Sequence, residues 1–162
     1  TGNFKIGDTL TEGEDLQFQG IPSFSPEIFK EIRNDDPMKS KQLEKGVKQL
    51  TDEGVAQLFT LNLNGRKVIG TVGALQFEVI QYRLLHEYSA QCSFENLNVH
   101  KACWVEAETD SPDFKEFQRI KQKFLAKDKS GKLVFLADSA FSLQMTQDKY
   151  REIQFHYTSE FK

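Results

Sequence analysis

The residues of this chain that could act in chemistry are two cysteines and three histidines. Cys92 and Cys103 are the only thiols, and His86, His100 and His156 are the only imidazoles. His100 lies three positions before Cys103, and Cys92 lies eleven positions before it, so a zinc site would need scattered ligands. A nucleophilic pair of Cys92 and His86 would need a tertiary contact, and no oxyanion motif accompanies it. We therefore expect both cysteines to be small buried side chains on strands, and we predict no catalytic residue, metal or cofactor.

The glycine pattern does not indicate a nucleotide site. The sequence has no GxxxxGKS or GxxxxGKT loop, so the backbone N–H groups that cradle the phosphates of a nucleotide are missing. Gly70 and Gly73 lie three residues apart without a basic partner. We interpret them as glycines at the exit of a strand that allow close helix packing.

Positive charges are concentrated in two parts of the sequence, although the formal net charge of the chain is -3. Lys41, Lys45 and Lys48 form one stripe on the first helix, with Lys39 nearby. The second concentration consists of Lys115, Arg119, Lys121, Lys123, Lys127, Lys129 and Lys132. Such clusters could bind RNA phosphates by releasing counterions. On the residues alone, ordinary solvated helix faces with interspersed acidic side chains are the favoured interpretation.

Composition sets broad limits on the class of protein. The chain has 162 residues, of which 38% are hydrophobic and 28% charged, as in a globular protein of one or two domains. It has no apolar run of about 18 residues and no charged-then-apolar leader, so we expect a cytoplasmic protein without a membrane partner. Two cysteines suit a reducing compartment. The acidic balance argues against non-specific nucleic-acid binding, and we expect no DNA partner.

The first predicted elements are a strand over residues 27–33 and a charged amphipathic helix. Asp36 is the expected N-cap of this helix and Pro37 its first residue, where a missing N–H is not needed. Gly54 is the expected left-handed stop. The apolar stripe consists of Leu43, Gly46, Val47 and Leu50. Gly46 in this stripe would let the helix lie close to a sheet.

The next pattern predicts a hairpin, a second helix and a fourth strand. Strands are expected over residues 55–63 and 66–72, joined in a tight hairpin by the Asn64-Gly65 pair, which tolerates positive φ at both positions. The helix begins after Ala74 and ends near Tyr88. Its predicted inner side consists of Leu75, Val79, Tyr82 and Leu85. With a strand over residues 90–94, this completes a βαββαβ sandwich, the ferredoxin-like plan of an α+β fold.

A second strand and helix unit is predicted after residue 98. It begins with a strand over residues 101–107, followed by Ser111 and Pro112 as N-cap and first residue of a helix. The apolar residues of this helix are Phe114, Phe117, Ile120 and Phe124. A turn at residues 128–131, a strand at 133–138, a helix at 142–152 and a final strand from 153 follow. This unit could extend the first sheet or pack beside it.

Four long segments of the sequence resemble one family. They are DPMKSKQLEKGVKQLTDEG, GTVGALQFEVIQYRLLHEY, FENLNVHKACWVEAET and YREIQFHYTSEF. The first two resemble the domain after the β-barrel in ribosomal translocation GTPases, and all four together resemble the C-terminal portion of bacterial peptide-chain release factor 3. The translocation factors have Gly-Glu-Leu-His where this chain has Gly73-Ala74-Leu75-Gln76. That departure favours the termination factor.

The resemblance implies a domain organisation. Residues 1–20 are then the last strands of a truncated β-barrel, residues 21–26 are a linker and residues 27–162 are a C-terminal α+β domain. Within this domain, residues 27–98 are the ferredoxin-like unit and residues 99–162 an extension specific to the release factor. The opening residues also alternate like two short strands, which could not form a stable domain alone.

The resemblance also implies a function. The parent protein would be a ribosome-dependent GTPase that promotes dissociation of class I release factors, with GTP and Mg bound in an absent G domain. This chain would be its ribosome-docking domain, not an enzyme, and its partners would be rRNA, a small-subunit ribosomal protein and the rest of the factor. Two alternatives are a non-ribosomal protein-interaction module and a small ferredoxin-like enzyme. The candidate ribosome-binding residues are Lys39, Lys41, Lys45, Lys48, Arg119, Lys121, Lys123, Lys127 and Lys129.

Overall fold

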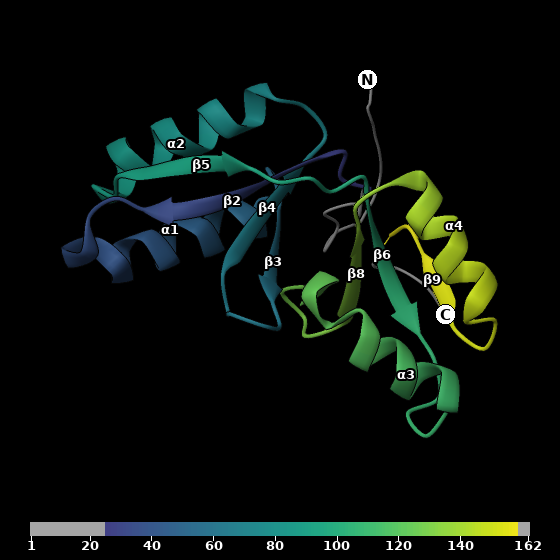
Figure 1. The fold of residues 1–162 in the computed structure, drawn as a ribbon. Helices are drawn as coiled ribbons and strands as arrows, with labels where there is room; N and C mark the ends of the chain where they lie inside the picture. Colours follow the sequence, from purple (N-terminus) through teal and green to yellow (C-terminus); the bar gives the residue numbers. More distant parts are fainter. Residues whose placement is uncertain (1–24, 159–162) are drawn as a thin grey trace, which may run out of the picture.

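The computed structural model describes residues 25–158, in which four α-helices cover one eight-stranded antiparallel sheet (Figure 1). The order of the strands across the sheet is β5-β2-β4-β3-β7-β8-β6-β9. This mixture of helices and an antiparallel sheet confirms the predicted α+β class. The predicted barrel segment, residues 1–20, and residues 21–24 of the predicted linker lie outside the described residues.

The elements fall into two consecutive units of the chain. The N-terminal unit consists of β2 (Ile28–Asn34), η1 (Pro37–Lys39), α1 (Ser40–Asp52), β3 (Gln57–Leu61), β4 (Lys67–Thr71), α2 (Leu75–Tyr88) and β5 (Cys92–Asn96). The C-terminal unit consists of β6 (Lys101–Glu106), α3 (Pro112–Ile120), η2 (Gln122–Phe124), β7 (Leu125–Lys127), β8 (Leu133–Ala137), α4 (Ala140–Lys149) and β9 (Gln154–His156).

The two units are joined edge to edge in the same sheet. β3 pairs with β7 in antiparallel register, with Thr60 opposite Lys127 and Leu61 opposite Ala126. In addition, the backbone N–H of Asn62 donates to the carbonyl of Leu125 at 3.0 Å. The second unit therefore extends the first sheet, which settles the alternative that periodicity left open.

Strand alternation divides the interior into three hydrophobic cores, because successive side chains of a strand point to opposite faces. One core lies beneath α1 and α2, and another beneath α3 and α4. Between them, the opposite faces of the two units pack together in what we call the shared core. It consists of Phe29, Phe59, Val68, Ala102, Trp104, Ala126, Val134 and Leu136. The ring centroids of Phe59 and Trp104 lie 5.7 Å apart, so each unit rests directly on the other.

The start of α1 follows the predicted cap with one difference. The carboxylate of Asp36 accepts a hydrogen bond from the N–H of Met38 at 3.1 Å, but Pro37 opens a 3-10 turn and the α-helix begins at Ser40. The helix is followed by Gly54 with a φ of 85°, as predicted. Gly46 serves a different contact from the predicted one: a Cβ there would lie 2.5 Å from Cδ2 of Leu84. The glycine therefore brings α1 close to α2, and not to the sheet.

The predicted tight hairpin is longer than its sequence pattern suggested. β3 ends at Leu61 and β4 begins at Lys67, which leaves a loop at residues 62–66. Gly65 has a φ of 74°, whereas Ser89 is the non-glycine residue with positive φ among residues 25–158. Asn64 is therefore not left-handed, and the prediction of a tight hairpin at Asn64 and Gly65 is wrong. Its side-chain oxygen instead accepts from the N–H of Arg66 at 3.0 Å, a local bond that stabilises the wider loop.

The predicted inner face of α2 is also wrong. Leu75, Val79, Tyr82 and Leu85 are exposed, whereas the buried residues of this helix are Phe77, Ile80 and Leu84. The helix carries apolar residues on both sides, so the spacing rule fits two faces equally well. Tertiary packing selects the second face: Phe77 makes an edge contact with Phe94 at 5.2 Å between centroids.

The C-terminal unit departs from prediction at its helix ends. Ser111 caps α3 by accepting from the N–H of Phe114 at 3.3 Å, but the helix ends at Ile120, which is exposed. Phe124 belongs to a 3-10 turn that leads into β7, a three-residue strand that the sequence did not indicate. α4 begins after Ser139, earlier than predicted, and ends at Lys149.

Candidate functional site

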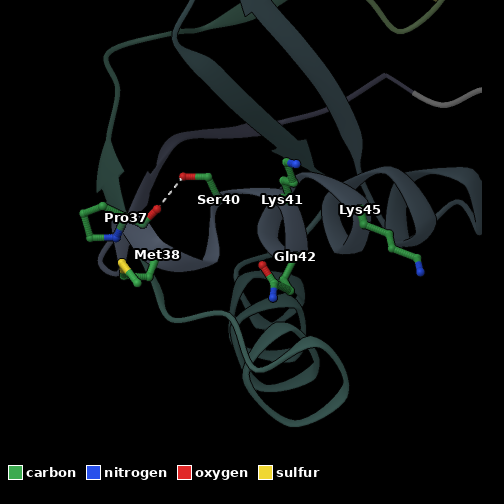
Figure 2. Close-up of a pocket in the computed structure, with 6 residues that line it drawn as sticks. All are labelled: Pro37, Met38, Ser40, Lys41, Gln42 and Lys45. Carbon is green, nitrogen blue, oxygen red and sulfur yellow. Dashed lines mark hydrogen bonds between the residues drawn. The ribbon is translucent and has the colours of Figure 1, made fainter.

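The lysines of α1 form the first candidate surface. Lys41 and Lys45 are exposed, Lys39 is half-buried at the start of the helix, and no ion pair within residues 25–158 involves them. We call these three residues the α1 cation face. Lys41 and Lys45 border an open hollow of about 470 Å³ together with Met38 and Gln42. Figure 2 shows the Lys45 side chain extending away from the helix, and both lysines are exposed to an external anion.

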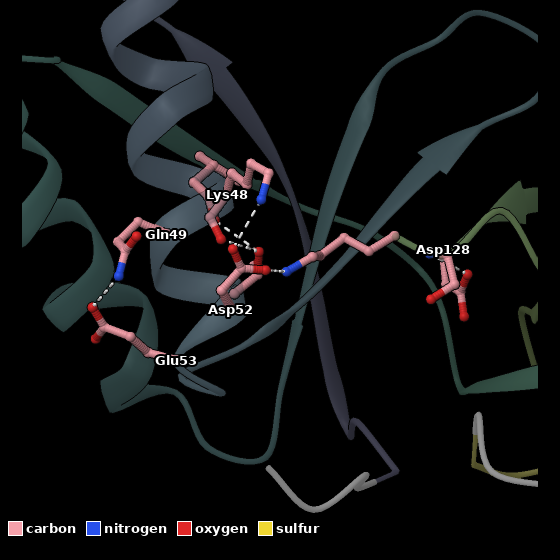
Figure 3. Close-up of polar contacts among 9 residues, drawn as sticks. Lys48, Gln49, Asp52, Glu53 and Asp128 are labelled. Carbon is pink, nitrogen blue, oxygen red and sulfur yellow. Dashed lines mark hydrogen bonds and ion pairs between the residues drawn. The ribbon is translucent and has the colours of Figure 1, made fainter. Parts of the chain in front are cut away.

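Lys48, unlike the lysines of the α1 cation face, forms an ion pair, and it lies near a lysine from the other predicted patch. Its Nζ pairs with Oδ2 of Asp52 at 3.0 Å (Figure 3). Lys129 from the β7–β8 turn pairs with the other carboxylate oxygen. Burial lowers the pKa of Lys129, and the nearby charge of Lys48 lowers it further. The fold thus brings together two lysines that the sequence placed in separate patches. Both lysines pair with the same carboxylate, that of Asp52.

A groove of about 780 Å³ lies beside this contact, between α1, the β3–β4 loop and the β7–β8 turn. Its lining contains two cations that the sequence analysis missed, Arg66 and Lys67. Their position directly after the Asn64-Gly65 turn is the sequence feature that could have identified them as surface cations. Arg66 pairs with the buried carboxylate of Glu31 at 3.6 Å, and Lys67 donates to the hydroxyl of Thr60 at 3.1 Å. The remaining lining residues are Ile32, Asn34, Ser40, Leu43, Glu44, Val47, Lys48, Leu58, Gly65, Asp128 and Lys129.

The second candidate surface lies at the end of α3. Arg119 and Lys123 are exposed, and Lys121 is half-buried with its ammonium 5.8 Å from the centre of the Phe124 ring. We call these three residues the α3 cation face. Lys127 is exposed on β7 opposite Thr60, near the junction of the two units. Sequence proximity therefore kept three members of the predicted patch together, whereas Lys127 and Lys129 belong to the junction.

The cysteines are buried in the hydrophobic cores, and two of the histidines contact neighbouring side chains. Cys92 and Cys103 are buried, and burial raises the pKa of the first thiol to about 11 and of the second to about 12. Thiols held in the neutral form are poor nucleophiles and metal ligands. His86 stacks on Tyr82 with centroids 4.1 Å apart, and His156 contacts Glu106 at 2.9 Å.

Residues 25–158 contain neither a candidate metal cluster nor a membrane-spanning helix. Among residues 25–158, no group of three or more His, Cys, Asp and Glu side chains is placed to hold a metal ion. The helices of the same residues include none with the length and apolar character needed to span a bilayer. The two cation faces carry ammonium and guanidinium groups, which bind phosphate or carboxylate oxygens.

The sequence matches the family described as class II release factor RF3, C-terminal domain, over residues 18–147. The match covers well over half of the chain and includes every element from β2 to α3, as well as β7, β8 and most of α4. The chain therefore belongs to the family of class II release factor RF3 C-terminal domains.

Proposed function

We propose that this domain docks a class II release factor on the ribosome during translation termination. The observation that carries the proposal is that an acidic chain exposes two compact groups of cations, on α1 and at the end of α3. Free cations of this kind bind RNA phosphates mainly by releasing counterions. The family match supplies the ribosomal setting.

The proposal extends to the parent protein. We infer that the factor promotes dissociation of class I release factors, that it is a cytoplasmic GTPase, and that GTP and Mg bind outside the present chain. The small-subunit rRNA, a small-subunit ribosomal protein, and the G domain and β-barrel of the factor are the proposed partners. This domain contributes shape and charge to the complex, and no bond-making step.

We also propose that the N-terminal unit is a ferredoxin-like unit within a domain over residues 27–162, with residues 99–162 as its extension. The βαββαβ order and the antiparallel strand order β5-β2-β4-β3 support this assignment. Residues 1–20 as the end of a β-barrel and residues 21–26 as a linker belong to the same proposal.

Co-sedimentation with purified ribosomes tests the docking surface. Two double charge reversals, Lys41→Glu with Lys45→Glu and Arg119→Glu with Lys123→Glu, are compared across about 50–200 mM salt. We expect reversal of the docking face to weaken binding about tenfold or more and to reduce its salt dependence. Arg151→Glu, at an exposed residue outside both faces, is a control that makes half of the charge change of each double variant. Unchanged binding in both double variants would remove the proposal.

A further inference from the structure

The outer face of α2 is apolar although it points to solvent. Val79 and Leu85 are 40% and 42% exposed, and Leu75 and Tyr82 are 65% and 64% exposed. These four residues lie at i, i+4, i+7 and i+10, so they form one continuous stripe along the helix. Val72, just before the helix, is 52% exposed as well. We call the four helical residues the α2 outer stripe.

The interior of the domain cannot account for this stripe. The opposite side of α2 already packs Phe77, Ile80 and Leu84 into the core beneath the helix. A helix that is apolar on two sides is normally covered on both, and a contiguous exposed apolar patch marks an interaction site. α4 differs, because Phe141 and Met145 are exposed there as an isolated pair.

The charges around the stripe favour one class of partner. Glu78 lies exposed within the outer face, and no ion pair of residues 25–158 includes it. Arg83, at the border of the face, bonds both Glu53 and Glu87, at 2.8 and 2.9 Å. These four side chains carry three negative charges against one positive charge. Phosphate groups would be repelled here, whereas a lysine or arginine of a partner would be attracted.

We propose that the α2 outer stripe is a docking surface for a basic protein. Apolar side chains of that protein cover Leu75, Val79, Tyr82 and Leu85, and one of its lysines or arginines pairs with Glu78. The partner's cations also face the border formed by Glu53 and Glu87. The proposal rests on the proposed ribosome docking, because the ribosome supplies the basic protein, and it assigns this contact to protein and the cation faces to RNA.

Matched charge reversals test the division. Glu44 on α1 and Glu78 on α2 are both exposed, so Glu44→Lys and Glu78→Lys make the same chemical change on two helices. In co-sedimentation with purified ribosomes, we expect Glu78→Lys to weaken binding at least about fivefold. Glu44→Lys, which adds a cation beside Lys41 and Lys45, should strengthen binding and steepen its salt dependence.

The outcomes separate the two proposals. Stronger binding by both variants would mean that α2 also meets phosphate, and would overturn the inference alone. If ribosome binding is weakened by Glu78→Lys and unchanged by Glu44→Lys, RNA docking by α1 would be overturned and the α2 contact retained. Absence of wild-type co-sedimentation at low salt would overturn both.

A photo-crosslinker identifies the class of molecule directly. p-Benzoylphenylalanine replaces Val79, and the matched control carries it at Met145 of α4. After irradiation on purified ribosomes, the Val79 position should crosslink to a basic ribosomal protein, and the Met145 position should remain at background. Crosslinks from position 79 to rRNA only, or none while co-sedimentation persists, would overturn the inference. Circular dichroism melting of each variant checks that the fold is retained.

Discussion

The N-terminal and C-terminal units share one strand order but build their helix layers differently. In each unit the fourth strand pairs with the first, the first with the third and the third with the second. The second strands, β3 and β7, meet at the centre of the sheet. The same plan is therefore laid out twice, in opposite directions from the junction (Figure 1).

The helix layer of the N-terminal unit depends on close helix contact. Gly46 of α1 lies against Leu84 and Tyr88 of α2. In the C-terminal unit, aromatic rings fill the space between helices and sheet. Phe117 lies at the centre of that cluster, with Phe135, Tyr150 and Phe155 at 5.4, 5.6 and 5.7 Å between centroids. The same topology therefore allows two ways of packing its helices: close helix contact at a small residue, or a set of large aromatic side chains between helices and sheet. In both units the interior is filled.

The strongest test of the comparison is Phe59→Ala, which removes a shared-core side chain. Phe59 is fully buried and contacts Phe29 of its own unit and Trp104 of the other. We expect a loss of about 3–5 kcal/mol in the free energy of unfolding. Hydrogen exchange should then accelerate in strands of both units. Faster hydrogen exchange confined to β2–β4 would show that the units are stabilised independently. Leu63→Ala, at an exposed residue, is the control.

Gly46→Val tests the helix contact that is specific to the N-terminal unit. A Cβ at this position would lie 2.5 Å from Leu84, which is itself fully buried and cannot move aside freely. We expect a loss of about 2–3 kcal/mol, measured by urea unfolding, because overpacking forces the two helices apart. Gln42→Val makes a comparable change on the exposed side of α1 and should cost about 0.5 kcal/mol. Equal losses in the two variants would contradict a packing role for the glycine.

Local signals predicted the elements well because they act over a few residues. Asp36 and Ser111 each cap a turn of helix and precede a proline, and both caps are formed in the structure. Strand alternation found most strands of the sheet. β7 was missed because its three residues follow a 3-10 turn and are too few to show a period.

The candidate surface was harder to predict because it depends on tertiary contacts. Lys129 and Asp52 are 77 positions apart, yet they form an ion pair. No spacing rule brings them together. The exposed side of α2 was assigned to the core because its apolar spacing satisfies the same rule as a buried face. Amphipathic spacing identifies a face that needs a partner, but it does not say whether the partner is the domain's own sheet or another molecule.

Tyr150→Phe tests the aromatic cluster that packs the helices of the C-terminal unit, and it removes one hydroxyl group only. The Tyr150 hydroxyl donates to Oε2 of Glu116 at 3.0 Å and thereby ties the end of α4 to α3. Removing the hydroxyl should cost about 1 kcal/mol in unfolding free energy while the ring packing is retained. Tyr82→Phe, at an exposed tyrosine of the N-terminal unit, should be neutral. Equal stability of the two variants would assign the contribution of Tyr150 to its ring alone.

Arg83→Met tests the smallest difference, an exposed ion network that spans α2 and the end of α1. Hydrogen bonds from Arg83 lower the pKa of both Glu53 and Glu87. A carboxyl whose pKa falls on folding stabilises the protein above its unfolded pKa, and this contribution is lost as the pH falls through the folded value. Wild type should therefore be more stable than Arg83→Met at neutral pH, and the difference should shrink below about pH 4.5. Urea midpoints of both proteins from pH 7 to pH 3 measure it, and a difference that stays constant with pH would assign the role of Arg83 to packing of its aliphatic stem.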